Sequence, residues 1–155
     1  MKKNQKGFSL IELLIVVAII LIIAAIAIPN LLRSRMAANE ASAVGSLRTV
    51  NTACVTYSTN YPNIGYPPSL VSLGPATSAT STSADLVDSV LAGGTKSGYT
   101  FTFAAGTGTP STGYSVLADP TSRGTSGQRG FYTDQSGVIR YDPTTTATSA
   151  SSPLQ

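Results

Sequence analysis

The hydrophobic and polar positions divide this chain into an apolar front and a mixed remainder. After Glu12 come 20 uncharged residues, 13–32, of which 18 are Ala, Val, Ile or Leu; only Pro29 and Asn30 interrupt them. A run of about 20 apolar residues is long enough to cross a bilayer as a helix, and a helix satisfies its own backbone in lipid. The pattern predicts a membrane-spanning helix over residues 8–32. We expect a kink near Pro29, because proline removes a hydrogen bond inside the helix.

Residues 33–61 predict an amphipathic continuation of the same helix, which ends at Tyr61 because Pro62 follows. Apolar residues recur there at steps of three and four, on one helix face. These residues are Val44, Leu47, Val50, Cys54 and Tyr57. The face is the expected contact with a globular head, and Cys54 is expected to be a small buried residue.

The predicted head covers residues 62–142 and begins with a loop region rich in Pro, Gly, Ser and Thr. Residues 69–73 indicate a helical turn. Residues 84–92 indicate a short helix with Ser83 as its N-cap, ended by two glycines.

Strands follow in the second half of the head. Residues 98–103 alternate with period two, and 114–118 form the expected partner. Segments 131–133 and 138–141 flank a turn that ends in Gly137 and predict a hairpin. Three or four antiparallel strands after a long helix indicate an α+β fold.

The last segment, residues 143–155, is rich in Ser and Thr. It has too few apolar residues for a core, so we expect a disordered tail.

The amino-acid composition limits the kinds of catalytic and metal-binding site that the chain can form. The 155 residues include no His and one Cys, which excludes His-dependent acid–base catalysis, Ser-His-Asp triads and His/Cys metal sites. Asp119, Asp134 and Asp142 do not form a D-x-D-x-D-G calcium loop, and Asp134 is expected to be a turn residue. We therefore expect no enzyme, no cofactor and no metal.

The charge balance does not indicate a nucleic-acid partner. The chain has 10 Lys and Arg against 7 Asp and Glu, a net charge of +3. Lys2, Lys3 and Lys6 supply that excess, because 10 − 3 leaves 7 bases against 7 acids. A basic surface typical of nucleic-acid binding is therefore not predicted. The three lysines favour a cytoplasmic N-terminus.

Glu12 is the unusual residue of the apolar segment. An acid inside a membrane helix costs about 2.5–3.5 kcal/mol on insertion scales and is a functional candidate; alternatively, Glu12 lies at the level of the lipid headgroups. If the chain is cut between Gly7 and Phe8, the new amine of Phe8 is a cation near Glu12. Between staggered helices, this amine of one copy can neutralise Glu12 of the next and set an axial register.

The Lys6-Gly7 step, Phe8, Glu12, the apolar run and Pro29 together resemble the N-terminus of type IV pilins. The short leader and the Phe start look like the type IVa subclass or the related type II secretion pseudopilins. The resemblance implies that residues 1–7 are a class III leader. A prepilin peptidase cleaves such a leader, here after Gly7, and then N-methylates Phe8. It also implies an assembly role for Glu12, a helix bend at Pro29 and the pilin fold. Many of these pilins have a C-terminal disulfide, which a single cysteine cannot form.

The same resemblance implies a structural subunit of an extracellular type IV pilus, used in adhesion, motility or DNA uptake. Its implied partners are copies of itself in a helical filament, an assembly ATPase and an inner-membrane platform, after a stage as a prepilin in the inner membrane. The alternatives are a pseudopilin or minor pilin of a type II secretion-like system, and a membrane-anchored surface-binding domain. An uncleaved anchor does not account for Gly7, Phe8 and Glu12 together. A secretory signal peptide has a shorter apolar core than this one.

Overall fold

The computed structural model describes residues 7–154 and consists of an N-terminal unit, Met1–Arg35, and a head unit, Met36–Gln155. Residues 1–6 of the predicted leader lie outside the described residues. Helix α1, Leu10–Asn60, belongs to both units and has 51 residues. The predicted long helix is therefore confirmed, with a start two residues later than expected.

Within the N-terminal unit, α1 contains Pro29 without a break in the helix assignment. Proline has no N–H to give to the carbonyl of Ala25. The next residue adds a bond of its own, because Asn30 Nδ2 donates to the carbonyl of Ile26 at 3.0 Å. The kink at Pro29 stays a prediction.

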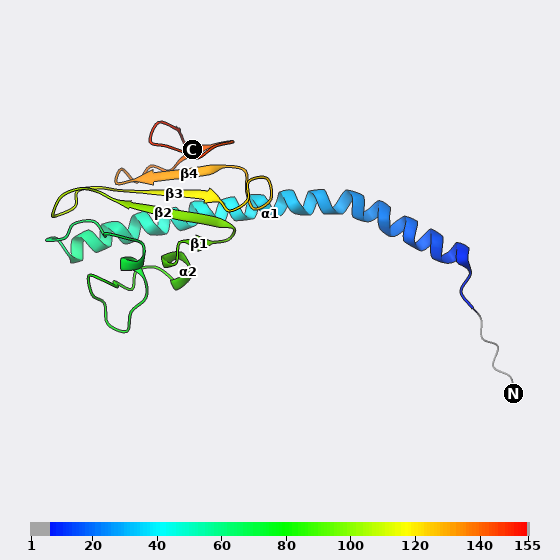
Figure 1. Cartoon of the computed structure of the whole chain (residues 1–155), viewed down its shortest axis with the longest axis horizontal. Coiled ribbons are helices and arrows are strands. Elements are labelled where there is room, and N and C mark those ends of the chain that lie inside the picture. The colour runs from blue at the N-terminus through cyan, green and yellow to red at the C-terminus, as the bar shows by residue number, and fades with distance from the viewer. Residues whose placement is uncertain (1–6, 155) are drawn as a thin grey trace. The chain divides into compact units, whose positions relative to one another are not determined.

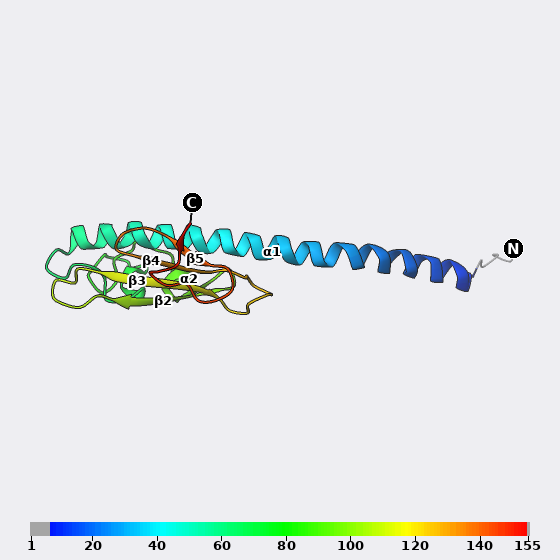
Figure 2. The ribbon, with the colours of Figure 1, turned by 90° about the horizontal axis from the view of Figure 1, so that it is seen from above.

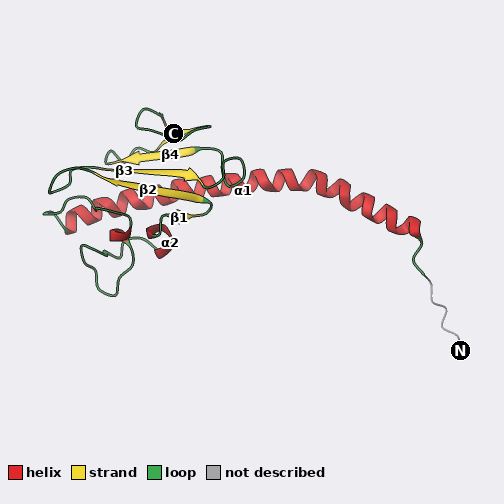
Figure 3. Cartoon of the chain, viewed as in Figure 1, coloured by secondary structure: helices red, strands yellow, loops and turns green. Residues whose placement is uncertain are grey.

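The head contains a six-stranded antiparallel sheet in which strands follow one another in chain order (Figures 1 and 3). The strands are β1 Thr95–Lys96, β2 Tyr99–Ala105, β3 Tyr114–Pro120, β4 Gly130–Asp134, β5 Arg140–Asp142 and β6 Ser152–Pro153. The four strands expected from the sequence correspond to β2–β5. The expected count of three or four was too low, because β1 and β6 have two residues each and leave no alternation to detect.

The register places one row of apolar side chains on the face of the sheet that α1 covers (Figure 2). Phe101 pairs with Ala118, which pairs with Phe131, and all three are buried. Val116 pairs with Thr133 in a second row beside the first, and both residues are buried. The predicted face of α1 packs into the same core, with Val44, Leu47, Val50, Cys54 and Tyr57 all buried. The amphipathic pattern is thus confirmed.

Along the chain, two short helical elements come between α1 and the first strand of the sheet. The turn η1, Val71–Leu73, confirms the turn expected at 69–73. Helix α2, Ser89–Ala92, is shorter than predicted and has Asp88 as its N-cap, with the carboxylate accepting from Leu91 N at 3.0 Å. The predicted cap was wrong, because Ser83 Oγ donates instead to the carbonyl of Pro75 at 2.9 Å. Asp85 has a φ of 56° and so cannot continue a right-handed helix.

The C-terminal segment is ordered, so the expected disordered tail was wrong. Strand β6 pairs with β5, and Leu154 N donates to the carbonyl of Ile139 at 2.7 Å. Ala147 is fully buried. A polar segment can be held in place by backbone hydrogen bonds and a small apolar anchor, which composition does not reveal.

Candidate functional site

Helix α1 begins with a hydrogen bond that involves Glu12. Glu12 Oε2 accepts from Ser9 N at 2.8 Å, and the carbonyl of Ser9 accepts from Leu13 N at 3.2 Å. This is one half of a capping box, in which an acid three residues into the helix returns to the N-cap backbone. A negative charge at this end also suits the helix dipole. The spacing Ser9-x-x-Glu12 is a sequence signal for this role that the prediction from the apolar run did not include.

Gly7 and Phe8 lie ahead of the helix and are exposed. The side chain of Phe8 is 82% exposed. Exposed chain outside regular structure is where proteolytic cleavage is easiest. The bond between these two residues therefore has a suitable environment for processing, while cleavage and N-methylation themselves stay predictions.

The apolar run forms a helix surface without cover in the N-terminal unit. Its large side chains between Leu13 and Leu32 are between 44% and 68% exposed. Helix α1 is long enough and apolar enough to cross a membrane. None of its most apolar stretch is buried. An apolar surface this extensive marks a contact with lipid or with other protein.

Charges stand at both ends of that surface. Glu12 precedes it, and the exposed Arg33 and Arg35 follow it. At 1.5 Å per residue, Glu12 and Arg33 are about 32 Å apart along the helix axis. This is close to the thickness of about 30 Å of a bilayer's hydrocarbon core. The uncharged length therefore matches a membrane, with long basic side chains at its far boundary.

In the head, an ion pair between a buried carboxylate and a partly exposed arginine joins α1 to the loop before β4. Glu40 is only 7% exposed. Its Oε1 accepts from Gln128 N at 2.9 Å and Arg129 N at 3.1 Å, and its Oε2 accepts from Arg129 Nε at 2.7 Å. Burial raises the pKa of Glu40, but the hydrogen bonds from Gln128 and Arg129 and the charge of Arg129 outweigh it, so the net pKa is lowered. The carboxylate therefore stays charged at neutral pH.

A second polar contact joins α1 to the sheet. Asn51 Nδ2 donates to Thr133 Oγ1 at 2.9 Å, and Tyr114 OH donates to Asn51 Oδ1 at 2.9 Å. Thr133 Oγ1 can also donate to the carbonyl of Val138 at 3.2 Å. Polar groups that are satisfied in this way specify one arrangement of a core. Together with the ion pair, they attach the C-terminal half of the head to α1 where no disulfide is available.

Cys54 lies in the same core as a free, fully buried thiol, as predicted. Burial raises the pKa of Cys54 to about 12, against a smaller opposing effect of a hydrogen bond with Tyr114. A thiol that stays protonated at neutral pH is a poor nucleophile.

The acids considered for calcium have protein partners. Asp119 pairs with Arg123 at 3.1 Å and accepts from Thr146 Oγ1 at 2.9 Å. Asp134 accepts from Ser136 N at 2.9 Å, which confirms its role in the turn. Among residues 7–154 no three His, Cys, Asp or Glu side chains gather in a way that could hold a metal ion.

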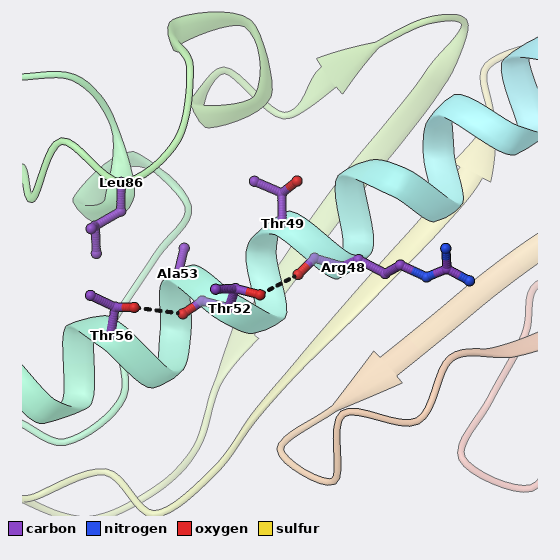
Figure 4. Close-up of a pocket in the computed structure, with 6 residues that line it drawn as sticks. All are labelled: Arg48, Thr49, Thr52, Ala53, Thr56 and Leu86. Carbon is purple, nitrogen blue, oxygen red and sulfur yellow. Dashed lines mark hydrogen bonds between the residues drawn. The ribbon is translucent and has the colours of Figure 1, made fainter.

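A shallow hollow of about 400 Å³ lies in the head against the exposed side of α1 (Figure 4). Its lining consists of Arg48, Thr49, Thr52, Ala53, Thr56 and Leu86. Thr52 and Thr56 donate their hydroxyl groups to helix carbonyls four residues earlier, at 3.1 and 3.0 Å. In Figure 4 the side chain of Arg48 extends away from Leu86. The hollow therefore has no cluster of converging polar groups.

Comparison with known proteins supports the resemblance of the N-terminus. The family described as "Prokaryotic N-terminal methylation motif" matches residues 2–28. The chain is 66% identical over 38 residues to the type IV wide pilus major component PilA4 of Thermus thermophilus, which covers 24% of this chain and 29% of the relative. It is 52% identical over 58 residues to the type IV major fimbrial protein FimA of Dichelobacter nodosus, covering 36% and 37%.

The type IV major pilin protein PilA of Myxococcus xanthus is 48% identical over 50 residues, covering 32% of this chain and 23% of the relative. The chain thus spans well under half of the length of these relatives, and no solved structure gives a significant match. Over the part that the comparisons cover, this chain is similar to type IV major pilins.

Proposed function

We propose that this protein is a structural subunit of an extracellular type IV pilus, assembled through its N-terminal helix. The observation that carries the proposal is the apolar helix surface over residues 13–32, which has no cover in the N-terminal unit and follows directly on the exposed Gly7–Phe8 bond. The methylation motif at residues 2–28 and the pilin relatives support it. The biological use of the pilus is adhesion, motility or DNA uptake.

In this proposal a prepilin peptidase removes residues 1–7 and methylates the new amine of Phe8. The prepilin waits in the inner membrane with residues 8–32 as its anchor and its head outside. The three lysines of the leader, against two arginines directly behind the apolar run, support that orientation.

Assembly needs more than the hydrophobic effect. Apolar side chains already have apolar surroundings in lipid, so their transfer into a helix bundle gains little hydrophobic free energy. Helix packing, neutralisation of Glu12 and external work supply the rest. An assembly ATPase and an inner-membrane platform are therefore the expected partners, together with further copies of this chain.

Glu12 has a distinct role in each state. Before processing, its carboxylate accepts from the backbone N–H of Ser9 in the same chain. After processing, the Phe8 amine of a neighbouring copy provides a full positive charge. The Coulomb attraction between two charges is stronger in an apolar bundle than in water, and either charge left unpaired there is costly, so the pair sets the axial position of one helix against the next.

The test is to shear the cells, image the released fraction and measure the intact mass of its main small protein. The proposal expects filaments whose subunit begins at N-methylated Phe8. A processed chain that stays in the membrane without filaments would instead identify a pseudopilin or minor pilin. A chain that still begins at Met1 would contradict the whole proposal.

A further inference from the structure

The head contains a cavity of about 520 Å³ near the C-terminal edge of the sheet. It lies between the loop that precedes β4 and the end of the chain's last strand. Arg129, Tyr141, Ser152, Pro153 and Leu154 line it. This volume lies in the range of about 300–1,000 Å³ that is typical of small-molecule sites, and the lining is more polar than the mostly apolar walls of such sites.

Arg129 is held in one orientation at the wall of this cavity. Its Nε donates to Glu40 Oε2 at 2.7 Å, and its guanidinium carbon lies 5.5 Å from the ring centre of Phe131 and 5.7 Å from that of Tyr141. The side chain is nevertheless 39% exposed. Within residues 7–154 its two Nη groups make no hydrogen bond, so four N–H donors of a fixed guanidinium remain for a ligand.

The arrangement favours a particular ligand chemistry. A guanidinium with both Nη groups free matches the two oxygens of a carboxylate. Tyr141 adds a flat ring beside it, and Ser152 adds a hydroxyl at the rim. Because Glu40 already balances the charge of Arg129, net charge attraction contributes little here to the binding of any anion. Recognition therefore depends on shape and on planar hydrogen bonding.

We propose that this cavity binds a carboxylate-bearing monosaccharide unit, such as a uronic acid. Arg129 receives the carboxylate, and the ring of Tyr141 receives the apolar face of the sugar. Every lining residue belongs to the head unit, so binding can be tested without filaments.

The experiment titrates the full-length protein in detergent with methyl β-glucuronide and follows binding by saturation-transfer NMR. Methyl β-glucoside, which lacks the carboxylate, and acetate, which lacks the ring, are the matched probes. We expect saturable binding of the glucuronide and at least about tenfold weaker binding of both others, a difference of about 1.4 kcal/mol. Equal binding of the glucoside or of acetate would overturn the proposal, and so would the absence of saturation.

Two variants locate the ligand. Arg129→Lys keeps a positive charge beside Glu40 but loses the planar pair of donors, and Tyr141→Leu removes the ring while keeping an apolar side chain. Each is expected to weaken glucuronide binding about tenfold. Arg48→Lys, in the hollow of Figure 4, is the control and should leave binding unchanged. If Arg129→Lys fails to fold, Tyr141→Leu decides, and full binding by that variant contradicts the proposal.

Discussion

At the scale of single residues, Glu40 is a charged group buried in the head. Its carboxylate accepts three hydrogen bonds from Gln128 and Arg129 while almost wholly buried. Glu40→Ala leaves Arg129 and two backbone N–H groups without this partner. We expect a loss of about 2–4 kcal/mol in the free energy of unfolding of the head. Urea denaturation followed by tyrosine fluorescence measures it, and a loss below about 0.5 kcal/mol contradicts this role.

The same residue predicts a dependence on pH. The pKa of Glu40 is lower in the folded head than its ordinary value of 4.5. Its contribution to stability is therefore fully present above about pH 4.5 and is lost as the pH falls through the folded-state pKa. We expect the midpoint of unfolding to fall more steeply on acidification in the wild type than in Glu40→Gln. Parallel curves for the two proteins would show that other carboxylates determine the acid response.

Glu12 can be tested with two substitutions that separate its two roles. Glu12→Gln keeps an oxygen that accepts from Ser9 N but removes the charge, whereas Glu12→Ala removes both. We expect both variants to remain stable in the membrane and both to impair filament assembly, because charge neutralisation between copies is lost. Sheared filaments are quantified by electron microscopy. Normal filaments from Glu12→Gln would limit the residue to helix capping.

At the scale of elements, Gly130 is the position where β4 meets the C-terminal segment. A Cβ at Gly130 would lie 2.6 Å from the carbonyl oxygen of Thr145 and 2.6 Å from Asp119 Oδ1. Gly130→Ala must therefore displace the segment that places Ala147 in the core. We expect a loss of about 1–3 kcal/mol, and faster amide exchange in the C-terminal segment than in β2 and β3.

Gly45→Ala is the matched control for that substitution. Gly45 lies inside α1, and a Cβ there meets no atom within 4 Å. The change should stabilise the head by about 0.5–1 kcal/mol, because alanine is the better helix former. Equal stability of the two variants would show that the C-terminal segment makes no close packing contact at β4.

The elements that could be predicted from the sequence are those that a local pattern of residues marks. The apolar run and the three- and four-residue steps predicted α1, and period-two alternation predicted β2–β5, because each pattern lies within one element. The Glu40–Arg129 pair joins residues 89 positions apart, and no local pattern marks it. The order of the C-terminal segment has a similar cause, since it comes from backbone pairing with β5. The capping box at Ser9 and Glu12 could have been predicted from the spacing of these two residues, but it was not.

At the scale of the whole molecule, the chain combines two units that require different surroundings. Residues up to Arg35 present apolar side chains that require lipid or protein, while the buried core lies entirely in the head. We therefore expect a fragment of residues 36–155 to fold by itself, soluble and monomeric, with one cooperative unfolding transition. Analytical ultracentrifugation and thermal denaturation test this. Aggregation of the fragment would show that the N-terminal unit takes part in folding the head.

The short outermost strands of the sheet also matter for crowded conditions. Both β1 and β6 have only two residues; β6 therefore presents a short edge, whereas β1 pairs only with Tyr99 and Thr100 and leaves residues 101–105 of β2 without an outer partner strand. Exposed edges of greater length recruit strands from other molecules and lead to aggregation. In a pilus, heads are held side by side at very high local concentration for the life of the fibre. At the β6 edge, the short strand would let neighbouring heads of the proposed pilus touch without merging their sheets, so that each stays a separate folded domain.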